Sequence, residues 1–284
     1  MYNKNKQNDR PIPILFVSYG YIPLYQNHKL APEFISNLQM MGNYLRNYYK
    51  INNIIAISTH KCLKGAFLVS QSDQLKISHD HPFEFYYDID KIIKGSSQLS
   101  SLVINLLRAY QIDAQPDQSG TIDSSIWGPL QIMFPELDYP VVSISVNKNY
   151  ESETHLNIGK LLEEYRSKGS LIICFGGITQ NIHQFYEALA DEKKVKDPLA
   201  YNQFDGWCKK VIETMKGKDR QVKIMEYIKH PHYNRVHPTQ EHFMPLLIAI
   251  GASGSSPGKI FHQQMFKKCM SLSSYIFEEI VYSS

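Results

Sequence analysis

The stretch Pro13-Ile-Leu-Phe-Val-Ser18 is a continuous apolar run that stops at Tyr19-Gly20. Such a run lacks the alternation of a half-exposed strand, so it predicts a strand buried on both faces, and the glycine predicts a turn at its end. Similar runs predict three more buried strands, over residues 53–58, 140–146 and 170–175. Strands of this kind need helices on both sides of their sheet, so the intervening segments decide the fold.

Amphipathic helices are predicted between these strands. Phe34, Leu38, Met41 and Leu45 are spaced by four and three residues, which gives one apolar face to a helix over residues 32–49. Strands that alternate with helices predict a single-domain α/β fold, in which helices flank a central, mostly parallel or mixed sheet. Further helices are predicted over residues 97–110, 155–168, 201–216 and 241–251, and an edge strand over residues 270–277.

Three residues beyond the ends of predicted strands indicate where a pocket is expected. Tyr19 follows the first strand, His60 lies just past the second, and Gln180 comes shortly after the strand over residues 170–175. Ligands of open α/β sheets bind beyond the carboxyl ends of the strands. We therefore expect the pocket at the C-terminal ends of these strands.

Composition limits the classes of function. The 284 residues are 43% apolar and 20% charged, values that are typical of a globular protein. Lys and Arg number 30 and Asp and Glu 27, and no basic stripe concentrates the net charge of +3, which disfavours nucleic-acid binding. No apolar run approaches the roughly 20 residues that span a bilayer, so no membrane partner is expected.

The expected organisation is a polar N-terminal tail, residues 1–12, followed by one domain, residues 13–284. The first residues contain no apolar segment of the kind found in secretory signals. The 4 cysteines lie far apart and form no Cys-x-x-Cys pair, which argues against a disulfide framework and against a zinc site. We therefore expect a soluble, cytoplasmic protein.

Histidine is abundant, with 11 residues. Imidazole is a common metal ligand and the usual general base near neutral pH, although a single histidine is more often structural. His60 ends a buried strand, and Glu241-His242 is predicted to open an apolar helix, a rigid base for a side chain. Surface or solvated-loop positions are expected for His28, His155, His230, His232 and His237.

Five segments, taken in their order along the chain, carry a resemblance to a known family. They are residues 14–20, residues 57–60, the segment 77–88 that contains His79-Asp80, residues 123–146, and residues 176–181 with 239–247. In this order they resemble the class III extradiol ring-cleavage dioxygenases, the LigB-type superfamily, and above all its DOPA 4,5-dioxygenase-like branch. The resemblance extends over nearly the whole chain.

The resemblance implies an iron(II) or zinc ion at the strand ends. Such an ion is held by two histidines and a third histidine or a carboxylate, with open positions for a catecholate and dioxygen. By resemblance, His60 and His242 are metal ligands with Glu241 beside them, and His79 is a retained catalytic histidine. The implied partners are a small aromatic substrate and either a second copy of the chain or an active paralogue.

Three positions depart from the family pattern. Tyr19 replaces a histidine of the first turn, Ser124 replaces the histidine of an Asp-His-Gly-Thr/Ser-Trp motif, and Gln180 replaces the acid/base histidine. Neither serine nor glutamine suits general-base catalysis near neutral pH. The roles implied by position are catalytic for Tyr19 and Gln180, and substrate-binding for Tyr21, Ser124, Trp127 and Asn181.

These departures leave three functions open. The first is a divergent family member that keeps the pocket for a small oxygenated aromatic molecule but is repurposed or lacks standard ring-cleavage activity. The second is an active non-haem iron dioxygenase in which Tyr19 completes the metal site; the metal then has to deprotonate a phenol of ordinary pKa about 10. His183 and Cys62 are further candidate ligands that match no family motif. The third is a non-catalytic partner subunit of a heteromeric dioxygenase.

Overall fold

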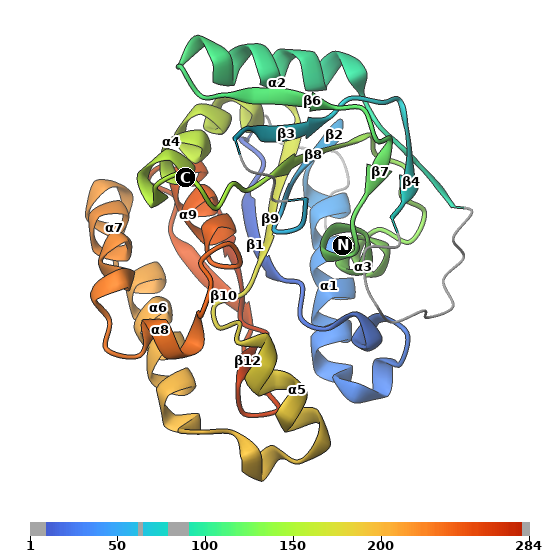
Figure 1. The fold of residues 1–284 in the computed structure, drawn as a ribbon. Coiled ribbons are helices and arrows are strands. Elements are labelled where there is room, and N and C mark those ends of the chain that lie inside the picture. Colours follow the sequence, from blue (N-terminus) through green and yellow to red (C-terminus); the bar gives the residue numbers. More distant parts are fainter. Residues whose placement is uncertain (1–9, 62–64, 79–90, 280–284) are drawn as a thin grey trace, which may run out of the picture.

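A mixed sheet runs through the centre of the computed structural model, which describes residues 10–61, 65–78 and 91–279 (Figure 1). Four parallel strands form its middle, and antiparallel strands join them on both sides. The strand order is β10 (Gly258–His262), β13 (Ser274–Phe277), β1 (Ile14–Ser18), β9 (Ser170–Gly176), β2 (Asn53–Ser58), β8 (Val141–Ser145), β3 (Phe67–Ser70) and β6 (Ala114–Asp117).

The continuous apolar runs form the middle of this sheet. β1, β8 and β9 are buried along their whole length, because helices cover both faces. The predicted α/β fold with a mixed sheet is therefore confirmed. The predicted edge strand near the C-terminus is wrong in its position, because β13 lies between β1 and β10 and pairs with both.

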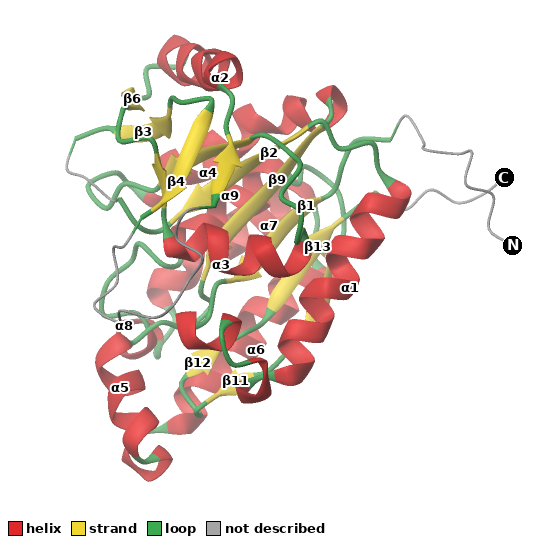
Figure 2. Cartoon of the chain, turned by 90° about the vertical axis from the view of Figure 1, so that its right-hand side faces the viewer, coloured by secondary structure: helices red, strands yellow, loops and turns green. Residues whose placement is uncertain are grey.

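Helices pack on both faces of the sheet (Figures 1 and 2). α1 (Pro32–Tyr48) and α3 (Ser124–Met133) contact each other on one face, and α4 (Ser152–Leu162) and α9 (Met244–Ala252) contact each other on the other. α2 (Ser97–Ala109) packs against β3 and β6. The bounds of α1 and α2 agree closely with the predicted ranges, whereas α3 was not predicted.

Three predicted helix starts are wrong by three residues. The helix predicted from residue 201 is α6 (Pro198–Thr214), and the starts of α4 and α9 also differ. α4 begins at Ser152 rather than at His155, and it continues as the 3-10 helix η3 (Glu163–Lys168), which ends at the predicted residue 168 with Gly169 as its C-cap. Gly169 has a φ of +89°, a left-handed conformation that favours glycine. α9 begins at Met244, so Glu241 and His242 lie in the turn before it rather than in its first turn.

The remaining elements are short, except for α6, which has 17 residues. The 3-10 helices η1 (Ile22–Tyr25) and η2 (His28–Leu30) follow β1 in the sequence. A three-stranded sheet contains β5 (Ile92–Lys94), β4 (Gln74–Ile77) and β7 (Thr121–Ile122). A two-stranded sheet contains β11 (Met265–Phe266) and β12 (Met270–Ser271). Among the described residues, no helix has both the length and the apolar character that crossing a bilayer requires. Between β9 and α9 lie α5 (Ile182–Ala190), η4 (Glu192–Lys194), α6 (Pro198–Thr214), α7 (Gly217–Ile224), η5 (Met225–Lys229) and α8 (Tyr233–Val236).

Two glycines allow α4 and α9 to cross at very short range. A Cβ atom built at Gly159 would lie 2.1 Å from the carbonyl oxygen of Ile248, and one at Gly251 would lie 2.1 Å from that of Leu156. No larger residue fits at either position without moving a backbone. The crossing therefore fixes α9, and with it the turn that carries His242, against the sheet.

Two histidines that were expected at the surface are buried. His155 is 0% exposed, and its Nε2 accepts a hydrogen bond from the backbone N–H of Asn147 over 3.2 Å. His237 is 2% exposed, and its Nε2 lies 2.8 Å from the carbonyl oxygen of Ile178, to which it donates. Burial lowers the pKa of His155 to about 4 and the pKa of His237 to about 3, so both rings are neutral structural groups at neutral pH.

Candidate active site

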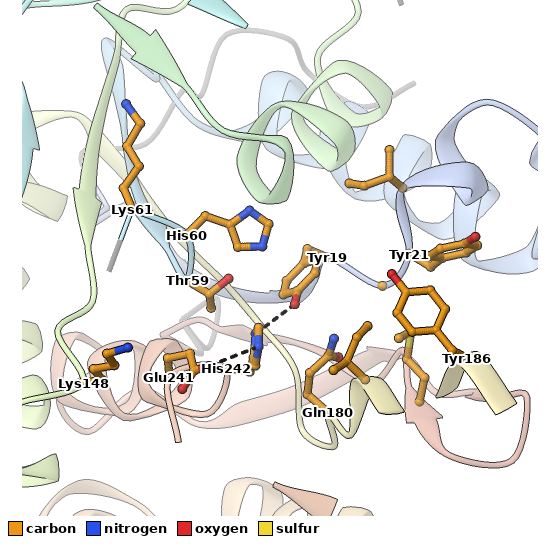
Figure 3. A pocket seen from close by; sticks show the side chains of 14 residues that line it. Tyr19, Tyr21, Thr59, His60, Lys61, Lys148, Gln180, Tyr186, Glu241 and His242 are labelled. Carbon is orange, nitrogen blue, oxygen red and sulfur yellow. Dashed lines mark hydrogen bonds and ion pairs between the residues drawn. The ribbon is translucent and has the colours of Figure 1, made fainter. Parts of the chain in front are cut away.

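A cavity of about 490 Å³ opens beyond the carboxyl ends of β1, β2 and β9 (Figure 3). We call it the strand-end cavity. Its walls come from the residues that follow these strands, from the turn before α9 and from α5. The described residues that line it are Tyr19, Gly20, Tyr21, Ile22, Thr59, His60, Lys61, Lys148, Gln180, Ile182, Tyr186, Glu241, His242 and Met270.

Tyr19, His60 and His242 lie together in this cavity, and their side chains converge in Figure 3. The hydroxyl oxygen of Tyr19 is 2.8 Å from Nδ1 of His242. The ring of Tyr19 stands edge-on to the ring of His60, with centroids 5.7 Å apart, and its centroid is 5.9 Å from that of His242. Three residues that are far apart in the sequence therefore share one small space.

Tyr19 is held through both its backbone and its ring. Its N–H donates to the carbonyl oxygen of Gly176 over 3.1 Å, and its carbonyl oxygen accepts the hydroxyl of Tyr25 over 2.6 Å. The ring of Tyr25 fits there because Gly128 has no side chain; a Cβ atom at Gly128 would lie 2.7 Å from it. Burial, and then the negative charge of Glu241, raise the pKa of Tyr19 far above the ordinary value. The phenol therefore stays protonated.

A buried carboxylate lies behind His60. Asp123 is 1% exposed and caps the first turn of α3, because its Oδ1 accepts the N–H of Ser125 over 3.0 Å. Its Oδ2 accepts the hydroxyl of Ser58 over 2.5 Å. Nδ1 of His60 lies 3.7 Å from Oδ1 of Asp123, so the carboxylate faces this side of the imidazole.

Lys61 anchors the chain directly after His60. Its backbone is in the left-handed region, with φ at +54°. Its ammonium group donates to the carboxylate of Asp117 over 2.7 Å, to the hydroxyl of Ser119 over 2.8 Å and to the carbonyl oxygen of Thr121 over 2.8 Å. These bonds hold the end of β2 against the β6–β7 region, and they direct the lysine charge away from Tyr19.

His242 is also followed by a carboxylate. Its Nδ1 faces Tyr19, and its Nε2 lies 3.7 Å from Oε1 of Glu241. Burial, and then the neighbouring His60, lower the pKa of His242 to about 3, so the ring is neutral at neutral pH. A neutral imidazole carries a proton on one of its two nitrogens, so the tautomer of His242 decides whether Nδ1 accepts from the phenol of Tyr19 or donates to it.

The donor set does not fit the metal centre that the resemblance implies. Within the described residues, no three His, Cys, Asp or Glu side chains are placed so that they could share a metal ion. His60 and His242 supply two imidazoles, and the Nδ1 that faces the centre of the cavity is taken by Tyr19. His183 is exposed on α5 and does not line the cavity, and Cys62 lies outside the described residues.

Only some of the other predicted site residues line the strand-end cavity. Gln180 and Tyr21 line the cavity, and the ring of Tyr21 packs edge-on against Phe185 at 5.0 Å. Ser124, Trp127 and Asn181 are not among the described residues that line it. Asn181 caps α5 through its Oδ1 and donates from Nδ2 to a backbone carbonyl, while Ser124 and Trp127 are buried in α3. His79 lies outside the described residues.

Sequence reasoning missed several residues of the cavity wall. Thr59 directly precedes His60 at the end of β2, so the rule for strand ends applies to it as well. Lys148 follows β8, whose carboxyl end lies on the same side of the sheet as those of β1 and β2, so the rule for strand ends would have found it. Tyr186 comes from α5, a helix that was not predicted, and no local signal indicates its position.

Comparison with known proteins gives a consistent result. Residues 16–278 match the family model described as the catalytic LigB subunit of aromatic ring-opening dioxygenase. A 4,5-DOPA dioxygenase extradiol-like protein of Schizosaccharomyces pombe is 29% identical over 272 residues, 89% of this chain and 89% of that protein. The 4,5-DOPA dioxygenase extradiol of Mirabilis jalapa is 29% identical over 210 residues, 73% of this chain and 75% of that protein.

A solved structure shares the fold. The crystal structure of an uncharacterized protein from Escherichia coli K12 superimposes with a TM-score of 0.70 and covers 94% of this chain and 99% of that chain. The sequence identity is 23%, so the likeness bears on the fold alone.

Proposed function

Because the chain belongs to the LigB family of aromatic ring-opening dioxygenases, we propose that it binds a small oxygenated aromatic molecule in the strand-end cavity and lacks standard ring-opening activity. The proposal makes the chain a divergent member of its family. The cavity is retained for a ligand, and the chemistry at its centre is changed.

The hydrogen bond between Tyr19 and His242 carries this proposal. A ferrous centre of the implied kind needs three protein ligands with lone pairs directed at one point. At residue 19 the chain has a protonated phenol, which is hydrogen-bonded to Nδ1 of His242 instead of serving as a metal ligand. This arrangement supports a cavity that works without the family's metal centre.

The cavity wall suits an aromatic ring that bears oxygen substituents. Tyr21 and Tyr186 line one end, where the ring of a ligand can pack against aromatic faces and edges. Gln180 offers both a donor and an acceptor to a hydroxyl or carbonyl oxygen, and Lys148 lies at the opposite end. These groups bind and orient a ligand, and Gln180 moves no proton.

Metal analysis combined with ligand binding tests the proposal. The protein is purified without a histidine tag, loaded anaerobically with iron(II) and dialysed, and catechols and related phenols are titrated by calorimetry. We expect substoichiometric iron and saturable binding of at least one oxygenated aromatic. Gln180→Ala should weaken that binding about tenfold, the effect of one lost hydrogen bond, and the exposed control His183→Ala should not. Stoichiometric iron with oxygen uptake on catechol would refute the proposal.

The convergence of Tyr19, His60 and His242 favours a second candidate. In this alternative the phenolate of Tyr19 completes a metal site with the two imidazoles, and the chain is an active non-haem iron dioxygenase. The alternative requires that the metal removes the proton of Tyr19 against the effect of burial on its pKa. Retained iron that is lost in both Tyr19→Phe and His242→Ala, but kept in Gln180→Ala, would support it.

A further inference from the structure

One buried hydroxyl group in the wall of the strand-end cavity lacks an ordinary hydrogen bond. Thr59 is 2% exposed and lines the cavity, and no described group forms a hydrogen bond of normal geometry with its Oγ1 atom. Figure 3 shows this oxygen turned toward Tyr19 and His60, and it is near enough to Tyr19 to influence the pKa of that phenol. Buried polar side-chain atoms are nearly always hydrogen-bonded, so this exception calls for an explanation.

Another buried threonine shows the usual arrangement. Thr179 is 0% exposed, and its hydroxyl donates to the carbonyl oxygen of Cys269 over 3.0 Å and accepts the N–H of Ser271 over 2.9 Å. Thr179 is not among the described residues that line the cavity. The threonine in the core therefore has both bonds that the threonine in the cavity wall lacks, which is the difference expected if a ligand completes the bonding of Thr59.

Negative charge acts on the part of the cavity that Thr59 lines. The carboxylates of Glu241 and Asp123 both disfavour the ionised form of the neighbouring phenol and so raise the pKa of Tyr19. His242 is neutral at neutral pH, and Nδ1 of His60 faces Asp123 at 3.7 Å. The same two carboxylates would repel a ligand oxygen that carried a full negative charge.

The two lysines of the cavity wall lie away from Thr59. The ammonium group of Lys61 is bound to Asp117, and Figure 3 shows it directed away from Tyr19. In the same view Glu241 lies between Lys148 and His242. An uncharged hydroxyl group is therefore the form of oxygen that suits the position beside Thr59.

We propose that Thr59 hydrogen-bonds the hydroxyl group of a phenolic ligand, and that the strand-end cavity takes this phenol in its protonated, uncharged form. The inference rests on the proposed function, because it specifies how the same cavity holds an oxygenated aromatic molecule. The Oγ1 atom of Thr59 accepts a hydrogen bond from the phenol, and the charges of Glu241 and Asp123 keep the proton on the ligand.

Calorimetric titration of the full chain with phenol and catechol tests the contact with Thr59. Thr59→Val keeps the branched shape and removes the hydroxyl, so we expect it to weaken binding about tenfold, the effect of one lost hydrogen bond. Thr59→Ser keeps a hydroxyl and should restore most of the affinity. The matched control is Thr154→Val in α4, the same change at a partly exposed position outside the cavity lining, which should leave the affinity unchanged.

Thermal melting without ligand distinguishes a ligand contact from a structural one. Thr59→Val should melt at or above the temperature of the wild type, because the free chain loses no hydrogen bond. Thr179→Val removes two hydrogen bonds of the core and should melt lower. If Thr59→Val melts well below the wild type, its hydroxyl is bonded within the free chain and the inference is overturned.

The charge of the bound ligand is tested with para-nitrophenol, which loses its proton near neutral pH and turns yellow when ionised. If only the uncharged form binds, the affinity falls about tenfold for each pH unit above the pKa of the free ligand. Phenol stays protonated over this range and should keep its affinity, which controls for titration of the protein itself. The yellow colour should fade on binding, whereas retained colour with an affinity independent of pH would overturn the inference.

The possible results separate this inference from the proposed function. Saturable binding of phenols that is equally tight in the wild type and Thr59→Val overturns the inference and leaves the proposed function standing. Absence of saturable binding by every phenol and catechol, or stoichiometric iron with oxygen uptake on catechol, overturns the proposed function and the inference with it.

Discussion

Replacement of Gly159 by alanine should reverse the usual effect of that substitution in a helix. Alanine is favoured over glycine in a helix interior by about 1 kcal/mol. In α4, however, the added carbon would lie 2.1 Å from the carbonyl oxygen of Ile248 and 2.9 Å from the Cα atom of Gly251. Both neighbours are backbone atoms of α9, which no side-chain rotation can move away.

The size of the effect follows from this distance. Ordinary van der Waals contact begins near 3.4 Å, so the contact is too short by about 1.3 Å and the two helices must separate. Overpacking of a well-packed contact costs roughly 1–3 kcal/mol, and a rigid neighbour favours the upper part of that range. After the gain in helix propensity is subtracted, we expect Gly159→Ala to lower the free energy of unfolding by about 2 kcal/mol.

Urea unfolding followed by far-ultraviolet circular dichroism measures this change. The matched control is Gly206→Ala in α6, where an added Cβ atom would meet no atom within 4 Å. The control should raise the free energy of unfolding by up to about 1 kcal/mol. If Gly159→Ala is as stable as the wild type while the control gains stability, the close crossing of α4 and α9 is refuted.

Three other changes have expected outcomes. The folded-state pKa of His155 is about 4, below the unfolded value near 6.5, so only the unfolded chain binds a proton at this side chain between these pH values and stability is lost as the pH falls. In urea unfolding at several pH values, His155→Gln should reduce the slope of the unfolding free energy against pH by about 1.4 kcal/mol per pH unit, and an unchanged slope would contradict the burial of a neutral His155. Tyr25→Phe removes the hydrogen bond to the carbonyl oxygen of Tyr19 and should cost about 1 kcal/mol, so an unchanged urea midpoint would contradict that contact. Burial lowers the pKa of Arg220 to about 10, so the side chain remains charged at neutral pH and donates to carbonyl groups that follow α9. Arg220→Met leaves these carbonyl groups without this partner and should lower the free energy of unfolding by about 3 kcal/mol. An unchanged melting temperature would contradict this expectation.

The elements of the fold were predictable where residues close together in the sequence determine them. A continuous apolar run reports burial on both faces, and β1 and β9 follow from their own residues. The place of β13 inside the sheet was not predictable, because it depends on pairing with β1 over more than 250 positions of the sequence. The start of α9 was misjudged because Phe243 continues the apolar pattern, although Pro245 near the helix start already marks a later beginning.

The candidate site was predictable in its centre and less so at its margins. The rule for strand ends and the order of the segments together bring Tyr19, His60 and His242 to one place, and the structure has them in one cavity. The burial of His237 was missed because its partner, a carbonyl group after β9, is distant in sequence. Asn181 stands at a helix start, a position where asparagine is a common cap, and this local role was readable from the sequence.

Backbone contacts, rather than the chemistry of its side chains, fix the frame of the strand-end cavity. The N–H of Tyr19 donates to Gly176, and the N–H of Gly177 donates to the carbonyl oxygen of His242 over 2.8 Å. These backbone hydrogen bonds form whatever side chain stands at residue 19 or 242. A fold that is shared with other proteins over nearly the whole chain therefore does not show that their activity is shared as well. The same independence makes residue 19 informative, because its side chain can change from phenol to imidazole while the frame that aims it stays the same.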